Sequence, residues 1–473
     1  MNALTWIDRS VDYGKFCGNI FNNVNSKAQA VIKECDNWYA NRVIEDFHER
    51  TTVHGTPYQL NRMGFAKRCC ADDANLCEIA EVNGGNNKEQ HEYLVDILTQ
   101  NCFLPMFRKQ IESVSAKGTA ACYVRLDNAN IMSDNTVRGG NIRLNYVAAE
   151  NFIPLTVEND EVTEAAVAGT GLVGGKVRTT VVDFVKDEHG NYVSETNVFD
   201  EYGTLLPDMT TVVQLGSVKP FAVLRNAEVN NIDHMMGYGY PKVYGAIGIL
   251  KAVDLCFNVL YGDLDKADKL VLVNELLCKF DEAGNPITPN EQVKKTFVLL
   301  GGEKLPDQKE LVQEINPEIR VDSITKSFEL CLSLLSSMFG YGTKKYSFEN
   351  GQIKTATEYA GERQDAMQEL NKQRTEAENY VRDICKAVLW FSNTFQGTNW
   401  DLDEEITVDF DDSYVTDRQS ELESKRADAL SFREIPMLTI WYLMDRYQLS
   451  EKEATKYYQE GQADPDTDDE TED

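Results

Sequence analysis

The sequence predicts an α+β fold, and three features of the 473-residue chain support that prediction. Apolar residues follow helical spacing before about residue 118 and again from residue 244. From about 119 to 225 the period changes to two, in short β-branched runs separated by turn clusters such as DEHGN (187–191). Residues 351–390 then pass without a proline, which favours one long helix.

The first region, residues 1–243, is predicted to hold helices followed by a sheet. Helical spacing covers 27–48, 62–82 and 88–117, and the strand-like runs after them include KVRTTVVDFV, YVSETNVF and TTVVQL. Short strands separated by turn residues are typical of a meandering antiparallel sheet.

A second helical zone occupies residues 244–270 and carries one polar stripe. Asp254, Asn258, Tyr261 and Asp265 follow one another at steps of 4, 3 and 4. That spacing places them on one face of an otherwise apolar helix.

A short α+β insert is expected at 271–318, with a hairpin at FDEAGNPI (280–287), and a further helix at 319–340. The loop that follows, 341–354, is rich in glycine, lysine and tyrosine. Exposed loop lysines usually have no special role, but in so acidic a chain these form a small isolated positive site: Lys344 and Lys345, with Tyr346 beside them.

The start of the long helix has a recognisable signal. TATE (355–358) is a capping box, in which Thr355 accepts from the backbone N–H three residues on and Glu358 reaches back to the N–H of Thr355. The helix predicted at 355–391 carries a single apolar stripe beneath many charges. It fits either a coiled coil or a spine lying across other elements, and the small alanines in the stripe favour the spine.

The C-terminal part is predicted to contain a short strand, EITVDF (405–410), and helices around IPMLTIWYLMDRYQLS (435–450). The final segment, ADPDTDDETED, has too little apolar content to fold, so we expect the tail to be disordered.

Charge is the most unusual feature of the composition. The chain has 77 acidic and 47 basic residues, a net charge of −30, and residues 401–473 alone hold 23 acidic and 7 basic ones. Such a chain does not bind nucleic acid by blanket neutralisation of phosphates, which needs clusters of lysine and arginine. The excess of acidic residues serves solubility, or it lets a negatively charged molecule approach the protein without binding to it.

One glycine-rich motif suggests a nucleotide site and fails on its context. GTGLVG (169–174) matches G-x-G-x-x-G, and Lys176 follows. A dinucleotide fingerprint requires these glycines to open a helix, but KVRTTVVDFV after them is strand-like. A Walker loop requires Ser or Thr after the lysine, where Val177 stands. A glycine-rich hairpin turn is the better interpretation.

Metal and catalytic signatures are weak throughout the sequence. The five histidines are dispersed and none pairs at i, i+4 spacing, and DFDD (409–412) lacks the spaced carboxylates and the glycine of a calcium loop. No G-x-S-x-G occurs. We therefore expect no enzyme activity, no catalytic residue, no metal site and no cofactor.

The cysteines and the N-terminus indicate the compartment. The eleven cysteines include no C-x-x-C pair, and only Cys69, Cys70 and Cys77 cluster, which favours reduced cytosolic thiols. No run of 18 uncharged apolar residues occurs and MNALTWIDRSVDYGKF has no apolar block, so we expect neither a membrane span nor a signal peptide.

The order of these parts resembles a portal protein of tailed bacteriophages, most closely the portals of long-tailed phages of Gram-positive bacteria. The resemblance covers most of the chain. FAKRCCADDANLCE, LVDILTQNCFLPMFRKQIESVSAKGTAACYV and NIRLNYVAAENFIPLTVENDEV are similar to the family's wing, and SFREIPMLTIWYLMDRYQLSEKEA to its crown helices. The chain departs from the family at Tyr359, where an aliphatic residue is common after A-T-E.

The resemblance assigns each segment a part of the portal fold. Residues 1–243 would form the N-terminal region and wing, 244–270 and 319–340 the two stem helices, and 271–318 the clip. Residues 341–354 would be the tunnel loop, 355–410 the spine helix and strand of the wing, 411–460 the crown, and 461–473 the disordered tail.

The resemblance also implies a function and partners. Twelve copies would form a ring at one capsid vertex of the virion, assembled in the cytoplasm of the bacterial host. Double-stranded DNA would pass through the channel without sequence preference during packaging and ejection. The clip would meet the terminase packaging motor and later the head–tail connector, and the ring would contact major capsid and scaffolding proteins.

Two groups of residues then acquire candidate roles. The tunnel-loop residues Lys344, Lys345 and Tyr346 would face the DNA and make weak phosphate contacts. The stripe residues Asp254, Asn258 and Asp265 would line the channel, although a position against a neighbouring subunit is an equal alternative.

Two rival functions remain open. A nucleotide-using enzyme built on GTGLVGGK predicts ATP or NAD binding that is lost in Gly171→Val. An acidic cytosolic scaffold, whose long helix makes a parallel coiled coil, predicts elongated dimers or trimers instead of a closed ring.

Overall fold

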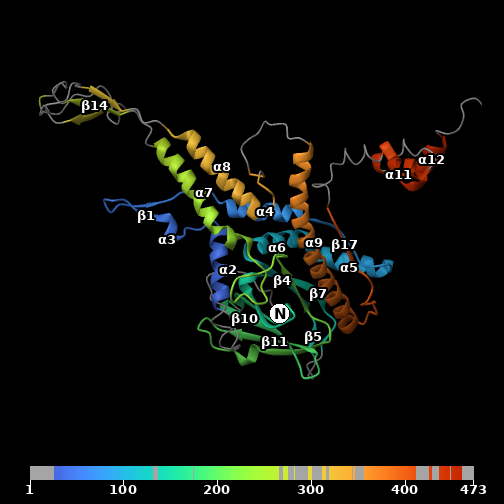
Figure 1. Cartoon of the computed structure of the whole chain (residues 1–473). Coiled ribbons are helices and arrows are strands. Elements are labelled where there is room, and N and C mark those ends of the chain that lie inside the picture. The colour runs from blue at the N-terminus through green and yellow to red at the C-terminus, as the bar shows by residue number, and fades with distance from the viewer. Residues whose placement is uncertain are drawn as a thin grey trace, which may run out of the picture. The chain divides into compact units, whose positions relative to one another are not determined.

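The computed structural model describes most of the chain (Figure 1). The described residues are 26–131, 137–173, 175–265, 270–274, 282, 297–300, 312–315, 319–343, 345–346, 356–411, 426–428, 436–447 and 449–460. Two compact units result. The larger comprises 1–77 with 82–408, and the smaller comprises 78–81 with 409–473. The α+β fold class predicted from the sequence is confirmed, with helices and antiparallel sheets in the described parts.

The N-terminal helices are shorter than the sequence predicted. They are α2 (Ser26–Tyr39), α3 (Glu45–His48), α4 (Phe65–Leu76), α5 (Lys88–Gln100) and α6 (Phe103–Lys117). The helix expected at 27–48 is interrupted because Asn41 adopts a left-handed φ of 52°. The helix expected at 62–82 ends at Leu76, and strand β3 (Ile79–Asn83) follows.

Local chemistry sets the ends of α5 and α6. The side chain of Asn87 accepts from the backbone N–H groups of Glu89 and Gln90, which caps the start of α5. Helix α6 ends at Gly118, whose φ of 83° suits the left-handed position that follows a helix. A side chain could not replace this glycine, because a Cβ there would lie 2.2 Å from the carbonyl oxygen of Gly239.

The antiparallel meander predicted from the period-two runs is confirmed. Five strands pair in the order β12-β11-β10-β9-β8. They are β8 (Phe152–Glu158), β9 (Glu161–Val173), β10 (Lys176–Lys186), β11 (Tyr192–Phe199) and β12 (Thr211–Gly216). A three-stranded sheet has the order β13-β4-β7, formed by β4 (Thr119–Asp127), β7 (Asn141–Ala148) and β13 (Phe221–Arg225).

The described residues also form three two-stranded sheets. They are β1 (Glu49–Thr51) with β2 (Pro57–Gln59), β5 (Asn130–Ile131) with β6 (Val137–Arg138), and β3 with β17 (Thr407–Phe410).

The glycine-rich motif at 169–174 lies in a hairpin, as interpreted from the sequence. Its described residues belong to β9, and Val173 pairs with Lys176 at the start of β10. Gly175 in the turn has a φ of 76°. Because β10 is a strand, the glycines do not open the helix that a dinucleotide site requires.

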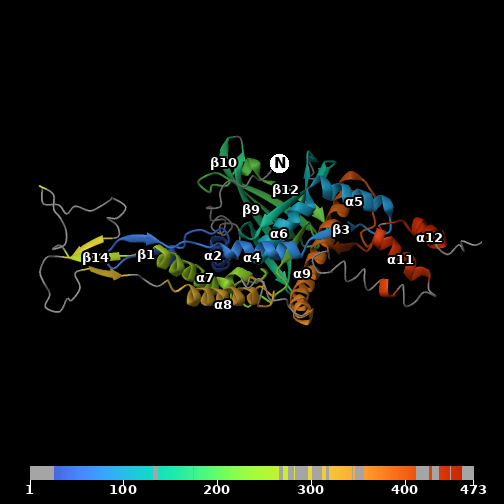
Figure 2. The ribbon, with the colours of Figure 1, turned by 90° about the horizontal axis from the view of Figure 1, so that it is seen from above.

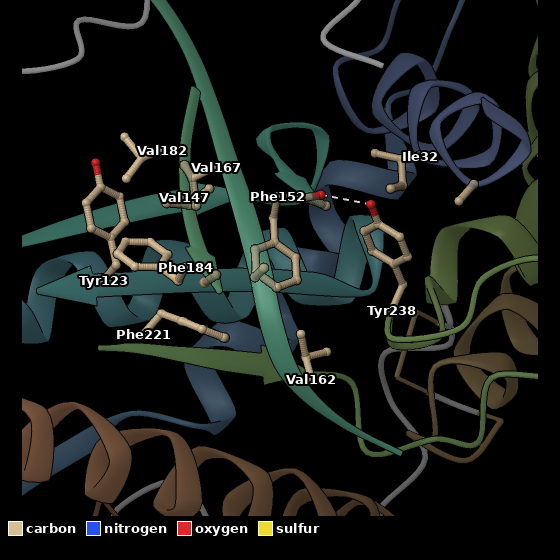
Figure 3. Packing of buried hydrophobic residues seen from close by; sticks show 14 of the residues in the cluster. Ile32, Tyr123, Val147, Phe152, Val162, Val167, Val182, Phe184, Phe221 and Tyr238 are labelled. Carbon is tan, nitrogen blue, oxygen red and sulfur yellow. Dashed lines mark hydrogen bonds between the residues drawn. The ribbon is translucent and has the colours of Figure 1, made fainter. Parts of the chain in front are cut away.

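One apolar core joins the two larger sheets and α2 (Figure 3). Phe152, Phe184 and Phe221 are almost fully buried there, and Ile32 contributes from α2. The hydroxyl of Tyr238 donates to the carbonyl of Phe152 at 2.8 Å, so this ring enters the core without leaving its polar atom unpaired.

Helices α7 (Lys242–Asp265) and α8 (Val321–Met338) pack side by side (Figures 1 and 2). Between them in sequence lie β14 (Leu270–Asn274), β15 (Phe297–Leu300) and β16 (Val312–Ile315). These form a sheet of order β15-β14-β16, with β15 parallel and β16 antiparallel to β14. The hairpin expected at 280–287 lies outside the described residues except for Glu282.

Helix α7 is unusually apolar for its length. It is the one helix among the described residues that is long and apolar enough, by length and composition, to cross a membrane, and 28% of its most apolar stretch is buried. Lys251 and Asp254 interrupt that stretch. Buried helices of protein cores have the same composition.

The long helix α9 extends over Ala356–Phe391, and a π-helical turn, Ser392–Gln396, continues it. It packs on β13, β4 and α5, with Tyr380, Ile384 and Val388 buried. For residues 367–391, where side chains are described, this is the spine arrangement favoured over a coiled coil.

The smaller unit contains α11 (Pro436–Tyr447) and α12 (Glu451–Glu460), which pack on each other. Ser450 begins α12 with a capping box. Its backbone N–H donates to the Glu453 carboxylate at 3.0 Å, and Glu453 N–H donates back to the Ser450 hydroxyl at 3.4 Å. The tail at 461–473 lies outside the described residues.

Candidate functional site: the loop after α8 and its anchor

The loop predicted from the sequence leaves the end of α8 through a tight turn. Gly340 and Gly342 both have left-handed φ values, 81° and 71°. Of the residues that follow, Lys345 and Tyr346 are described, whereas Lys344 and Thr355 lie outside the described residues. Glu358 belongs to α9, but its side chain is not described, so the predicted capping box stays a prediction.

Two tyrosines attach this loop to α4. The hydroxyl of Tyr341 donates to Asp73, and the hydroxyl of Tyr346 donates to Asp72 at 3.0 Å. The two rings meet edge to face at 6.4 Å, and Phe65 packs against Tyr346 at 6.3 Å. The base of the loop is therefore fixed by both polar and aromatic contacts.

Burial keeps both tyrosines in the protonated, donating form. It raises the pKa of Tyr341 well above its usual range, and the adjacent Asp73 charge raises it further. Burial and the neighbouring Cys69 raise the pKa of Tyr346 in the same direction. The two hydroxyl groups consequently act as hydrogen-bond donors to carboxylates throughout the physiological pH range.

Lys345 lies over one of these rings. Its Nζ is 4.0 Å from the ring centroid of Tyr341, which is the geometry of a cation–π contact. The side chain is half-buried. The sequence placed this lysine and Tyr346 on a DNA-facing loop, and the structure shows both of them engaged with the base of that loop.

A buried lysine links the same anchor to two further helices. Lys242, the first residue of α7, is 8% exposed. Its Nζ lies 3.5 Å from Asp73 and 3.2 Å from Glu369 of α9. We call Asp73, Lys242, Tyr341 and Glu369 the junction, because they join α4, α7, the loop and α9.

The charges of the junction are mutually supporting. Burial alone lowers the pKa of Lys242, but Asp73, Glu369 and the nearby Glu228 outweigh it and raise that pKa above its usual value. Burial likewise opposes ionisation of Glu369, but Lys242 outweighs it and lowers the pKa of that carboxyl. Lys242 is thus the cation that makes this group of acids tolerable inside the protein.

A small cavity lies beside the junction. Its volume is about 30 Å³, and its lining includes Asp73, Lys242, Tyr341 and Glu369. That volume holds a water molecule or two and no larger ligand. The arrangement is therefore suited to holding a loop in place, since a substrate would not fit.

The structure gives the polar stripe of α7 an internal role. Asp254 is 4% exposed, contacts Nε2 of His48 at 3.1 Å and accepts from the backbone N–H of Met63 at 2.8 Å. Asn258 makes two backbone hydrogen bonds with Asn61, each 2.8 Å long. These two residues hold the segment around β1 and β2 against α7.

This finding narrows the channel-lining prediction. Asp254 is covered by its own chain, because His48 and the backbone N–H of Met63 contact its two carboxylate oxygens. A side chain covered in this way does not line a channel. Asp265 is exposed at the end of α7, so its predicted role stays a prediction.

Four contributors to the anchor were not predicted from the sequence: Asp72, Asp73, Lys242 and Glu369. The adjacent acids of CADDAN in an amphipathic helix were the single local signal. In the described part of the chain, no three His, Cys, Asp or Glu residues are grouped so that they could hold a metal ion.

Comparison with known proteins adds no further constraint. No protein-family model matches the chain, and no curated protein matches it.

Proposed function

We propose that this chain is the subunit of a bacteriophage portal, a ring of twelve copies at one capsid vertex through which double-stranded DNA is packaged and ejected. The observation that carries the proposal is the order of the elements described between residues 242 and 391. Helix α7, a three-stranded insert, helix α8, an anchored loop and the long helix α9 follow one another, after a β-meander.

In this proposal each part has a mechanical task. Helices α7 and α8 are the stem, and the sheet β15-β14-β16 is the clip that meets the terminase motor and then the head–tail connector. The loop after α8 is the tunnel loop, and α9 is the spine of the wing. Residues 411–460 form the crown.

Exposed apolar side chains on the stem support assembly into a ring. Leu330 of α8 is 62% exposed, and several other large apolar residues of both helices are exposed in the single chain. Exposed apolar side chains on two paired helices are candidates for a protein interface. The residues concerned are Leu255, Val259, Tyr261, Leu264, Val321, Leu330, Leu334 and Met338.

The charge of the chain supports a channel for DNA. Twelve chains of charge −30 carry −360 in total, and an acidic lumen repels phosphates so that a duplex slides without adsorbing. The loop lysines then supply weak contacts that do not depend on sequence. The junction fixes the base of that loop, so force on it is passed to α4, α7 and α9.

The rival scaffold has less support. A parallel coiled coil requires the apolar stripe of the long helix to face another chain. In residues 367–391 that stripe is buried against β13, β4 and α5 of the same chain. This helix face is therefore unavailable to a partner helix.

The test is a charge reversal of the loop. Lys344→Glu with Lys345→Glu should leave the ring assembled while packaging or retention of DNA falls. The control is Lys33→Glu with Lys109→Glu, which makes the same charge change at exposed positions of α2 and α6. Equal packaging by both double variants would show that the loop does not contact DNA.

A further inference from the structure

Strand β13 has one unpaired edge. It pairs with β4 on one side, and in the described part of the chain no strand pairs with its other side. Two bonds that continue this ladder show which residues face β4: Val124 N–H donates to the carbonyl of Pro220, and Asn226 N–H donates to the carbonyl of Gly118. Pairing alternates along an antiparallel ladder, so the odd-numbered residues of β13 point their backbone groups away from β4.

One side chain already uses part of this outer edge. The side-chain amide of Gln373, in α9, donates to the carbonyl of Arg225 and accepts from the backbone N–H of Ala227, both at 3.0 Å. The N–H of Arg225 and both backbone groups of Val223 face the same way. None of these three groups has a hydrogen-bond partner among the described residues. Such an edge can accept a further strand.

A groove of about 350 Å³ lies along this edge. Its walls come from β13, the start of β9 and one face of α9. Glu376, Tyr380 and Asp383 line it at steps of 4 and 3, so a single face of the helix runs along the groove. The volume is within the range of ligand pockets, about 300–1,000 Å³. A short extended segment in this groove would lie against the β13 edge with α9 beside it.

Two bases of the groove are already paired with acids. The Nζ of Lys219 lies 2.7 Å from the Glu161 carboxylate and 3.0 Å from that of Asp383. Burial alone lowers the pKa of Lys219, but these two carboxylates outweigh it and raise that pKa, so the lysine stays charged. Arg225 pairs with Asp160 at 3.1 Å. Neither base is available to an acidic ligand.

Glu376 is an acid of the groove without a cation. Arg382, the remaining base in the lining, lies 2.7 Å from Glu378 on the same helix. Glu376 is half-buried and forms no ion pair with any described residue. A carboxylate in this position favours a positively charged occupant.

We propose that this groove binds an extended, basic segment of a partner protein, which adds to β13 as a further strand. The backbone of the segment accepts from the N–H of Arg225 and pairs with the backbone of Val223. A lysine or arginine side chain of the segment forms an ion pair with Glu376. Main-chain hydrogen bonds then supply affinity, and the basic side chain supplies specificity.

The charge of the chain argues against a second copy as the occupant. The chain has 77 acidic and 47 basic residues, so another copy would bring further acids to an acidic groove. A different protein with a basic extended segment is electrostatically complementary. The inference does not require that the chain be a portal subunit, because β9, β13 and α9 belong to one compact unit and the groove involves neither α7 nor α8.

The experiment uses the purified full-length chain and two libraries of heptapeptides with blocked ends. The central residue is lysine in one library and glutamate in the other, and β-branched and small polar residues vary around it. The tightest peptide of each library is measured by fluorescence anisotropy at low salt. We expect the lysine peptide to bind at least about tenfold more tightly and to slow amide hydrogen exchange at Val223 and Arg225. Equal affinities, or unchanged exchange at both residues, would overturn the proposal.

Two variants test the role of the unpaired acid. Glu376→Gln should weaken binding of the lysine peptide about tenfold. Glu89→Gln makes the same change at an exposed position of α5 and should leave the affinity unchanged. Equal affinities of the two variants would contradict the proposed ion pair.

Methylated peptides test the strand geometry. A strand presents only every second N–H to an edge, so methylation of one alternate set of peptide nitrogens should abolish binding while the other set is tolerated. Equal effects of the two sets would contradict the addition of a strand. If Val223 and Arg225 become protected when the concentration of the chain alone is raised, a second copy occupies the groove and the proposal is wrong. None of these readouts depends on ring formation.

Discussion

The buried lysine of the junction offers the most decisive prediction about stability. In Lys242→Met the apolar stem is kept while the ammonium is lost, so Asp73 loses this partner and Glu369 keeps the more exposed Lys372, 3.3 Å away. The lost attractions, from Lys242 to Asp73 and to Glu369, act over 3.5 and 3.2 Å. Each is about 5 kcal/mol at an effective dielectric constant near 20. The net loss is smaller, because the variant no longer has to bury a charged lysine. Removal of one partner from a buried ion pair typically costs about 3–5 kcal/mol, and we expect a loss of that size.

The pH dependence separates this cause from a simple packing defect. In the wild-type chain Lys242 lowers the pKa of Glu369, so the stability from this carboxyl is present above its unfolded pKa and lost as pH falls through the lowered folded value. In Lys242→Met burial of Glu369 is opposed mainly by Lys372 alone, so we expect the pKa of Glu369 to rise and the variant to gain stability as pH falls. The difference between the two proteins should therefore narrow from pH 8 toward pH 5.

The assay is urea unfolding followed by tryptophan fluorescence, at one fixed protein concentration, because guanidinium salt would screen the charges. Lys33→Met, at an exposed position of α2, is the matched control and should change the free energy of unfolding by less than about 0.5 kcal/mol. Adding Glu369→Gln to Lys242→Met should restore part of the loss. A loss below about 1 kcal/mol, or one that does not depend on pH, would refute the reasoning.

Three further predictions concern single positions. Gly118→Ala should lower the free energy of unfolding by more than about 2 kcal/mol, because its Cβ would lie 2.2 Å from a carbonyl oxygen. Gly139→Ala, whose Cβ would meet open space, should lower it by about 1 kcal/mol. Thermal unfolding measures both. Burial raises the pKa of Asp183 to about 6. Asp183→Asn should therefore raise the free energy of unfolding by up to about 3 kcal/mol at pH 8 and leave it unchanged near pH 4. A difference in unfolding free energy that stays constant with pH would contradict this. Tyr346→Phe should lose about 1 kcal/mol and speed amide exchange near the loop base; unchanged exchange would argue against the anchor.

Local periodicity accounts for the parts of the fold that the sequence predicted. The apolar run in KVRTTVVDFV marks a strand covered on both faces, because β10 is buried continuously over residues 181–184. The apolar stripe of α9 arises because the helix lies on β13 and β4. Breaks within helical patterns were harder to see. The left-handed turn at Asn41 has no strong local signature, so helical spacing alone predicts one helix over 27–48.

The anchor of the loop could not be read from the sequence for a different reason. Tyr341 and Asp73 are 268 positions apart, and Tyr346 and Asp72 are 274 apart, so no spacing rule connects them. The polar stripe of α7 shows the same limit. Its spacing was recognised correctly, but which partner covers Asp254 depends on the fold of residues 44–63.

The central claim, that the chain assembles into a portal ring, is tested most directly by native mass spectrometry with negative-stain images of the same sample. Twelve chains of 53.5 kDa total about 642 kDa. The account predicts a closed ring of about that mass with a central hole. A rod-shaped dimer or trimer would contradict it and would favour the coiled-coil scaffold.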